Sequence, residues 1–248
     1  MTKETTFNEI NQNWENKVTK ADDLLGAVGR SQDSGKLDII AKDISSKLEL
    51  GNKDILLEVG SGTGVLLSKL SEKSNSAYGV DYSSEAIKRA KKAFPKIQMN
   101  TTDAANLPFK DGKFDKLLCY SVFHYFGDME YAFSAINEFL RVCRKGGIIL
   151  IGDLPSEKHY HLSPYYNKLS ISLLLKKILE PIIRLIKRRP KVKKAPIINP
   201  QKWLWFNLDK ICDKLRSEGH EVDILEQPSI IQWSEVTYNH RFDLRIRK

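Results

Sequence analysis

A carboxylate and three closely spaced glycines form the first pattern in this chain that could bind a ligand. Residues 55–64 read Ile-Leu-Leu-Glu-Val-Gly-Ser-Gly-Thr-Gly, so Glu58 is followed by Gly60, Gly62 and Gly64. Glycine lets the backbone turn tightly and leaves space where a Cβ atom would crowd a ligand. The apolar run before these glycines and the helical pattern after them predict a buried strand, a tight turn and a helix N-terminus. Together these elements can bind a nucleotide.

A second carboxylate follows at the distance that such a site requires. Asp81 ends the next predicted strand, at residues 77–80, and lies 23 residues after Glu58. This separation is near the ~20 residues expected for an acid that binds both hydroxyls of a ribose. A carboxylate suits that role because it offers two acceptor oxygens to two adjacent donors. The alternative is that Asp81 only caps the following helix, for which Ser83 is also a candidate cap.

The glycine spacing argues against one kind of nucleotide site. The dinucleotide fingerprint would need a glycine at position 65, where this chain has Val65, and this disfavours a nicotinamide oxidoreductase. The segment 58–64 instead resembles motif I of the class I S-adenosylmethionine-dependent methyltransferases of the small-molecule type. The runs at 103–109 and 114–119 and the paired glycines at 146–147 resemble later segments of the same family. Lys145 stands where proline is usual.

The resemblance implies that S-adenosylmethionine is the cofactor and S-adenosylhomocysteine the product. Asp103 would accept a hydrogen bond from the adenine amine, and the backbone amide of Ala104 would donate to a ring nitrogen. A solvated turn is the alternative role for Asp103. The cofactor-binding residues implied in this way are Glu58, Gly60, Ser61, Gly62, Gly64, Asp81, Tyr82, Asp103, Ala104, Cys119 and Tyr120.

Candidate acceptor-side residues follow the fourth and fifth predicted strands, at 114–119 and 148–151. Ligands of open α/β sheets bind where such strands end. His124 has a near-neutral reference pKa that suits a proton acceptor. The favoured alternative is that His124 and Tyr125 only form a wall of the pocket. Asp153 is a candidate substrate contact or a loop cap. No cluster has the spacing of metal ligands, so we expect no metal site.

The order of predicted elements indicates a Rossmann-like, doubly wound α/β fold. We expect a seven-stranded, mostly parallel sheet with an antiparallel final strand, plus a helical lid insertion. The domain boundaries would be an N-terminal helical cap at 1–50, a core at 51–153 and 200–248, and an insertion at 154–199. In the family that the chain resembles, such N-terminal helices often cover the cofactor pocket. Packing at the sheet edge is the alternative.

The positive charge of the chain belongs to one segment. Residues 154–200 carry eleven Lys or Arg and two Glu, whereas the remainder carries 29 residues of each sign. An apolar helical face near 171–188 precedes a basic run that begins with Lys187 and Arg188. This segment could be a lid that attracts an anionic substrate, could lie on an anionic membrane through residues 165–194, or could grip RNA phosphates. A solvated face without a partner is the fourth alternative.

The expected function is methyl transfer to a small acceptor, anionic through a phosphate and sugar- or lipid-linked, in surface glycan or cell-envelope metabolism. Alternatives are an RNA or protein methyltransferase and a non-catalytic cofactor-binding protein. Nucleic acid is disfavoured because Cys119-Tyr-Ser-Val122 is not the proline-aromatic tetrapeptide of base-amine methyltransferases. Three separated cysteines, no apolar run of spanning length and a polar N-terminus predict a cytoplasmic protein, with a membrane-peripheral location as the alternative. The oligomeric state stays open.

Overall fold

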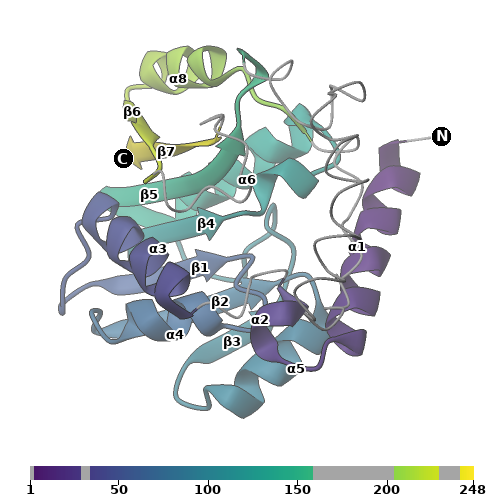
Figure 1. Ribbon diagram of the computed structural model, residues 1–248. Coiled ribbons are helices and arrows are strands. Elements are labelled where there is room, and N and C mark those ends of the chain that lie inside the picture. Colours follow the sequence, from purple (N-terminus) through teal and green to yellow (C-terminus); the bar gives the residue numbers. More distant parts are fainter. Residues whose placement is uncertain (1–2, 29–33, 159–203, 229–240) are drawn as a thin grey trace, which may run out of the picture.

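The described part of the chain is built on one mixed sheet. The computed structural model describes residues 3–28, 34–158, 204–228 and 241–248. Within them, seven strands lie in the order β3-β2-β1-β4-β5-β7-β6, and only β7 runs antiparallel to its neighbours (Figure 1). The strands are β1 (Ile55–Val59), β2 (Ser76–Asp81), β3 (Gln98–Thr101), β4 (Phe114–Tyr120), β5 (Cys143–Pro155), β6 (Glu221–Glu226) and β7 (Arg241–Arg247). The predicted fold class is confirmed.

Helices cover both faces of this sheet and bury two cores. The described helices are α1 (Lys3–Lys20), α2 (Leu24–Ala27), α3 (Ser34–Lys47), α4 (Val65–Ser71), α5 (Ser84–Ala93), α6 (Met129–Val142) and α8 (Leu208–Ser217), with a 3-10 turn η1 at Phe123–Tyr125. Apolar side chains of α6 and α8 pack on one face of the sheet, and those of α3, α4 and α5 pack on the other. Because β1 and β4 are buried on both faces, their sequences are nearly continuous apolar runs.

Side chains at the helix N-termini explain where several helices begin. The Ser83 hydroxyl accepts from the amide of Ala86 at 3.1 Å, as predicted for the start of α5. Asp128 caps α6 in the same way through the amide of Tyr131 at 2.9 Å. Each cap satisfies an amide that has no partner inside its own helix. These caps place α5 and α6 directly after the loops that follow β2 and β4.

Some boundaries differ from the sequence prediction. The sequence predicts a strand over 96–100, whereas β3 begins at Gln98. It also predicts that Gly146 and Gly147 stop the helix that begins at 129, whereas α6 passes directly into β5 at Cys143. The sequence predicts a helix over 203–217, after Pro200, whereas α8 begins at Leu208, because Phe206 first pairs with Ser156 and Asn207 supplies the cap. In each case the boundary is decided by a contact with a distant segment rather than by local pattern.

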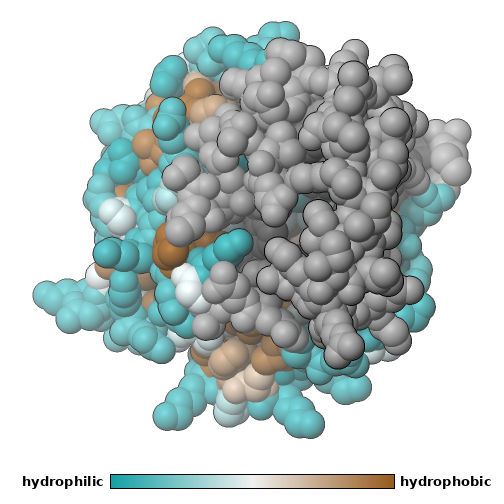
Figure 2. All heavy atoms as spheres, viewed as in Figure 1, coloured by the Kyte–Doolittle hydropathy of each residue, from teal (hydrophilic) through white to brown (hydrophobic). Residues whose placement is uncertain are grey.

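The predicted basic insertion lies almost entirely outside the described residues, which include only its first part, up to residue 158. No helix among the described residues is long and apolar enough to cross a membrane. Over the described part of the face in Figure 2, hydrophilic side chains predominate and apolar ones form small separate patches. This face therefore has the ordinary composition of a surface exposed to water over the residues described.

Candidate active site

A pocket lies at the carboxyl ends of the central strands, under helix α1. Its lining comes from the ends of β1, β2 and β4, the segments after them, and α1. The sequence-predicted residues that line it are Glu58, Gly60, Ser61, Gly62, Asp81, Tyr82, Ala104, Tyr120 and Tyr125. The topology thus brings together residues up to 67 positions apart, because parallel strands end at the same edge of the sheet.

The glycine turn after β1 forms the floor of this pocket. Gly60 and Gly62 have φ angles of 76° and 54°, which other residues rarely adopt. A Cβ atom at Gly60 would lie 2.2 Å from Val122, and one at Gly62 would lie 2.5 Å from Val28. Gly64, at the start of α4, has φ 77° but is not among the lining residues, because it packs against Met99 of β3. Side chains at these positions would fill the space or distort the turn.

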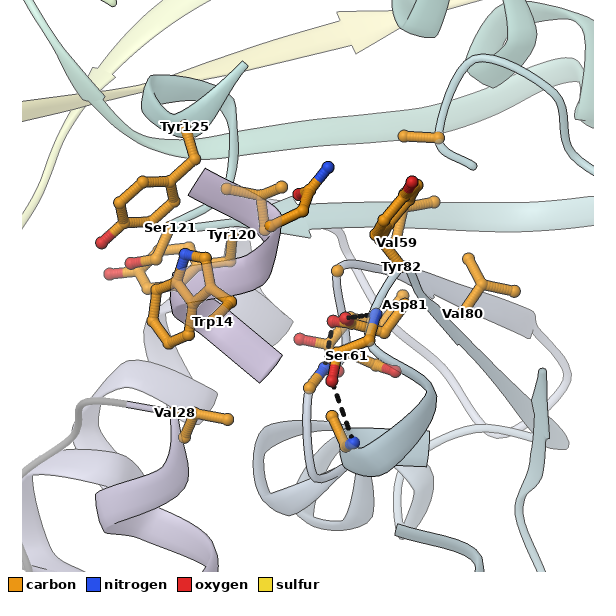
Figure 3. Close-up of a pocket in the computed structure, with 18 of the residues that line it drawn as sticks. Trp14, Val28, Val59, Ser61, Val80, Asp81, Tyr82, Tyr120, Ser121 and Tyr125 are labelled. Carbon is orange, nitrogen blue, oxygen red and sulfur yellow. Dashed lines mark hydrogen bonds between the residues drawn. The ribbon is translucent and has the colours of Figure 1, made fainter. Parts of the chain in front are cut away.

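Asp81 is fixed by the backbone around it. Its Oδ2 accepts from the amide of Gly62 at 2.7 Å, and its Oδ1 accepts from the amide of Ser83 at 2.8 Å (Figure 3). A carboxylate offers about four acceptor positions, so the group can still accept hydrogen bonds from a ligand. Burial raises the pKa of this carboxyl above its usual value of 3.8, and the nearby Glu15 carboxylate adds to the rise.

Asp103 lies behind the pocket wall rather than in it. Its Oδ1 accepts from the Tyr131 hydroxyl at 2.6 Å and from the amide of Ala105 at 2.7 Å. Tyr131, at the start of α6, lines the pocket itself. Burial, and then the hydrogen bond to Asp103, raise the pKa of Tyr131, so its hydroxyl remains a donor at neutral pH. The two side chains form a fixed pair between the loop after β3 and α6.

Aromatic rings form the other end of the pocket. The rings of Trp14 and Tyr125 meet edge to face, with centroids 5.2 Å apart. In Figure 3, Trp14, Ser121 and Tyr125 lie toward one end of the pocket, while Asp81 and Tyr82 lie toward the other. Helix α1 therefore contributes directly to the site through Trp14. The rings of Trp14 and Tyr125 together shield this end of the pocket from water.

Several candidates do not reach the lining. His124 is only 3% exposed, and its ring packs on Tyr125 with centroids 4.1 Å apart. Burial, and secondarily the charge of Arg241, hold the pKa of His124 well below its usual value, so the imidazole is neutral. Cys119 and Asp153 are also buried outside the pocket lining. Lys187 and Arg188 lie outside the described residues.

The sequence reasoning missed several lining residues. They include Asn11, Trp14 and Val18 of α1, Ser121 directly after β4, and Tyr131. Trp14 has a spacing of 3 and 4 with Phe7 and Ile10, which predicts one apolar face of a helix. This pattern does not indicate which other element that face contacts. Ser121 lies two residues after the strand predicted at 114–119, and this position is the signal that could have pointed to it. In the ranges that the structure describes, no three His, Cys, Asp or Glu side chains gather as metal ligands would.

Comparison with known proteins agrees with this geometry. The family described as "Methyltransferase domain" matches residues 57–151. An uncharacterized methyltransferase of Anoxybacillus flavithermus is 31% identical over 100 residues, covering 40% of this chain and 47% of that protein. A malonyl-[acyl-carrier protein] O-methyltransferase of Hamiltonella defensa is 34% identical over 104 residues, covering 41% of this chain and 38% of that protein. The chain spans about half or less of the length of these curated relatives.

Solved structures show the same fold at low sequence identity. A Haemonchus contortus phosphoethanolamine N-methyltransferase in complex with phosphoethanolamine and S-adenosylhomocysteine has a TM-score of 0.69. It is 14% identical, and the match covers 100% of this chain and 50% of that one. The N-methyltransferase NodS of Bradyrhizobium japonicum, in complex with S-adenosylhomocysteine, has a TM-score of 0.63. It is 16% identical and covers 96% of this chain and 98% of that one.

Proposed function

Because the chain belongs to the class I S-adenosylmethionine-dependent methyltransferases, we propose that it transfers a methyl group from this cofactor to a small acceptor. The observation that supports this most directly is the fixed Asp81 carboxylate, which lines the pocket beside the glycine turn with lone pairs to spare. Two adjacent ribose hydroxyls are the donors that such a carboxylate accepts best.

The other residues implied by the family resemblance are proposed to hold the remaining parts of the cofactor, with Asp103 and Cys119 lying behind the pocket wall. Asp103, held by Tyr131, would accept from the adenine amine, and the Ala104 amide would donate to the ring. Glu58, the glycine turn with Ser61, and Tyr82, Cys119 and Tyr120 would surround the ribose and the methionine part. The bound cofactor supplies a methyl group already activated by a sulfonium. The protein therefore has mainly to align the acceptor and exclude water.

The aromatic end of the pocket would perform that second task. Trp14 and Tyr125 close it from α1 and from the turn after β4. Displacing water from a charged reaction centre strengthens every electrostatic contact within it. We do not assign His124 as the base, because its neutral ring is buried outside the lining. Tyr125 stays a proposed acceptor contact.

The acceptor is proposed to be small, with an anionic, phosphate-like part that is sugar- or lipid-linked. This part of the proposal depends on the basic segment with Lys187 and Arg188, which would reach over the pocket as a lid or lie on an anionic membrane. Phosphoethanolamine, which is bound in the Haemonchus contortus enzyme, is a small phosphorylated molecule held by a similar fold. The rival acceptor is RNA, since one relative is named a probable tRNA methyltransferase 9B.

The test begins with cofactor binding, which needs no knowledge of the acceptor. Titration calorimetry should show S-adenosylhomocysteine bound by the wild-type protein. Asp81→Asn should bind it at least about tenfold more weakly, since hydrogen bonds to a charged group contribute ~1.5–3 kcal/mol. Affinity should also fall as the pH is lowered through the raised pKa of Asp81, because protonation removes the negative charge and turns one acceptor oxygen into a donor. Asp81→Asn should lose this pH dependence.

Turnover is then measured with the cofactor carrying a labelled methyl group. Small-molecule and RNA fractions of a cell extract are offered separately. Label in the small-molecule fraction supports the proposal, and label in RNA alone favours the rival acceptor. Binding without transfer to either fraction would indicate a non-catalytic binding protein. Unchanged affinity in Asp81→Asn would contradict the assigned site.

A further inference from the structure

Two residues with unusual backbone conformations meet at the ends of neighbouring strands. Ser121 follows β4 and Asp153 lies near the end of β5, and these strands are paired in parallel. Their φ angles are 62° and 64°, a region in which residues other than glycine are uncommon. Such outliers persist only where the surroundings enforce them, and they gather at functional sites. Ser121 lines the pocket, and Asp153 lies directly behind it.

The hydrogen bond between them determines what Ser121 can offer a ligand. The Ser121 hydroxyl donates to Asp153 Oδ2 at 2.5 Å. A serine hydroxyl has one proton and two lone pairs. With its proton given to the buried carboxylate, Ser121 can present only lone pairs to the pocket. This part of the wall therefore accepts hydrogen bonds and selects a ligand group that donates them.

Asp153 is held rigidly enough to maintain that polarity. Its amide donates to Asp243 Oδ1 at 2.9 Å, and its carbonyl oxygen accepts from Arg241 at 2.8 Å. The same guanidinium lies 3.5 Å from Asp153 Oδ1. Asp243 is in turn fixed by Lys47 at 2.7 Å and by Gln227 at 2.8 Å. The carboxylate cannot turn away from Ser121 without breaking this buried network.

The charge of the described lining favours a cationic donor. Among the described residues that line the pocket, the charged side chains are Glu58 and Asp81, both acidic. Aromatic rings also attract cations; the Trp14 ring already has Lys17 Nζ 4.3 Å from its centroid, so Tyr125 is the ring proposed to face a ligand cation. Ser121 lies toward the end of the pocket away from Asp81 (Figure 3), beyond the part proposed to hold the nucleoside. An ammonium or amine nitrogen satisfies the acceptor oxygen, the acidic lining and the Tyr125 ring together.

We propose that Ser121 binds the acceptor through an amine nitrogen and that Asp153, acting through Ser121, receives the proton that this nitrogen must lose. The inference rests on the proposed methyl transfer and names its acceptor class. The ammonium gives a proton to Ser121 Oγ while the Ser121 proton passes to Asp153 Oδ2. The freed lone pair of nitrogen forms the bond to the methyl carbon. The carbon–sulfur bond breaks, and its electron pair stays on sulfur. One positive charge, on the methylated ammonium, and a neutral Asp153 remain.

Sinefungin tests this without knowledge of the acceptor. In this analogue of S-adenosylhomocysteine, a carbon bearing an ammonium group takes the place of the sulfur. Calorimetric Kd values for both ligands are compared in wild type, Ser121→Ala and Asp153→Asn. The wild type should bind sinefungin about tenfold or more tightly than S-adenosylhomocysteine, and both variants should lose this preference. Asp153→Asn can donate to Ser121, which would turn the serine proton toward the ligand and reverse the polarity of the wall.

The pairing of ligands separates this inference from the proposed function. If Ser121→Ala lost affinity equally for sinefungin and S-adenosylhomocysteine, Ser121 would hold the methionine part of the ligand. If neither affinity changed, Ser121 would not contact the ligand. Either result overturns the inference. Thr102→Val, a pocket residue after β3, is the matched control and should affect both ligands equally. Failure of every protein to bind S-adenosylhomocysteine would instead count against the cofactor site itself. Thermal unfolding checks that each variant is folded. If Asp153→Asn is unfolded, the two Kd values of Ser121→Ala decide the question.

Discussion

At the scale of single residues, the site depends on side chains that fix one another. Asp103 is not among the residues that line the pocket. Its carboxylate is held in place by the Tyr131 hydroxyl on one side and by the amide of Ala105 on the other. A residue of α6 thus decides how the loop after β3 faces a ligand. Such supporting contacts hold a binding group close to its productive geometry.

Tyr131→Phe removes the hydroxyl but keeps the ring, so it tests this support. We expect S-adenosylhomocysteine to bind roughly 5- to 20-fold more weakly, since one hydrogen bond to a charged group is lost. The discrimination against an analogue that lacks the adenine amine should shrink as well. Calorimetry with both ligands measures this. Tyr78→Phe, outside the pocket lining, is the control and should leave both affinities unchanged. A weaker affinity with unaltered discrimination would indicate a packing role only.

At the scale of elements, helix α1 is fastened onto the N-terminus of α5. Glu15 accepts from the Ser84 amide at 2.8 Å and from the Ser83 hydroxyl at 3.0 Å. Arg89 of α5 donates back to the carbonyl oxygens of Thr19 and Ala21, near the end of α1. A carboxylate at a helix N-terminus is favoured by unpaired amides and by the helix dipole. This contact holds Trp14 over the pocket.

Glu15→Ala should loosen α1 without removing any residue that lines the pocket. A capping contact contributes ~1 kcal/mol, so we expect S-adenosylhomocysteine to dissociate roughly fivefold faster. Stopped-flow ligand displacement measures the rate, and hydrogen exchange of residues 3–20 should rise in parallel. Gln12→Ala changes an exposed residue of the same helix and should alter neither quantity. An unchanged dissociation rate would show that α1 does not limit release.

At the scale of the whole molecule, one buried ion pair joins the N-terminal part of the chain to the final strand. Lys47 of α3 contacts Asp243 of β7 at 2.7 Å, across 196 positions of sequence. Asp243 is fully buried, and burial raises its pKa, against the opposing effect of Lys47. The same carboxylate holds the amide of Asp153, so the network behind the pocket depends on this pair.

Lys47→Met should destabilise the protein by about 3–5 kcal/mol, because it leaves a buried carboxylate without its partner. Urea unfolding at neutral pH measures this loss. The folded-state pKa of Asp243 is raised, so ionised Asp243 opposes folding. The deficit should therefore be largest at high pH and shrink as the pH falls below that pKa. The control Asp223→Ala breaks an exposed pair with Arg245 and should cost about 1 kcal/mol or less. A deficit of that small size in Lys47→Met would contradict the structural role.

Neighbouring residues were enough to predict the parts of this protein that local chemistry controls. The apolar run before Gly60, the acid at Asp81 and the Ser83 cap follow from neighbouring residues and from strand or helix period, and the structure has them where they were expected. The order of these elements was enough to predict the sheet and its antiparallel final strand, because parallel strands separated by helices pack in few ways.

The packing of whole elements brings together side chains that lie far apart in the sequence. Trp14 faces Tyr125, Tyr131 holds Asp103, and Ser121 gives its proton to Asp153, all across segments that no local period relates. The same is true of His124, which follows β4 as a candidate base should but is buried beside the pocket rather than in it. Periodicity says which face of an element is buried, whereas the partner of a side chain depends on how whole elements pack.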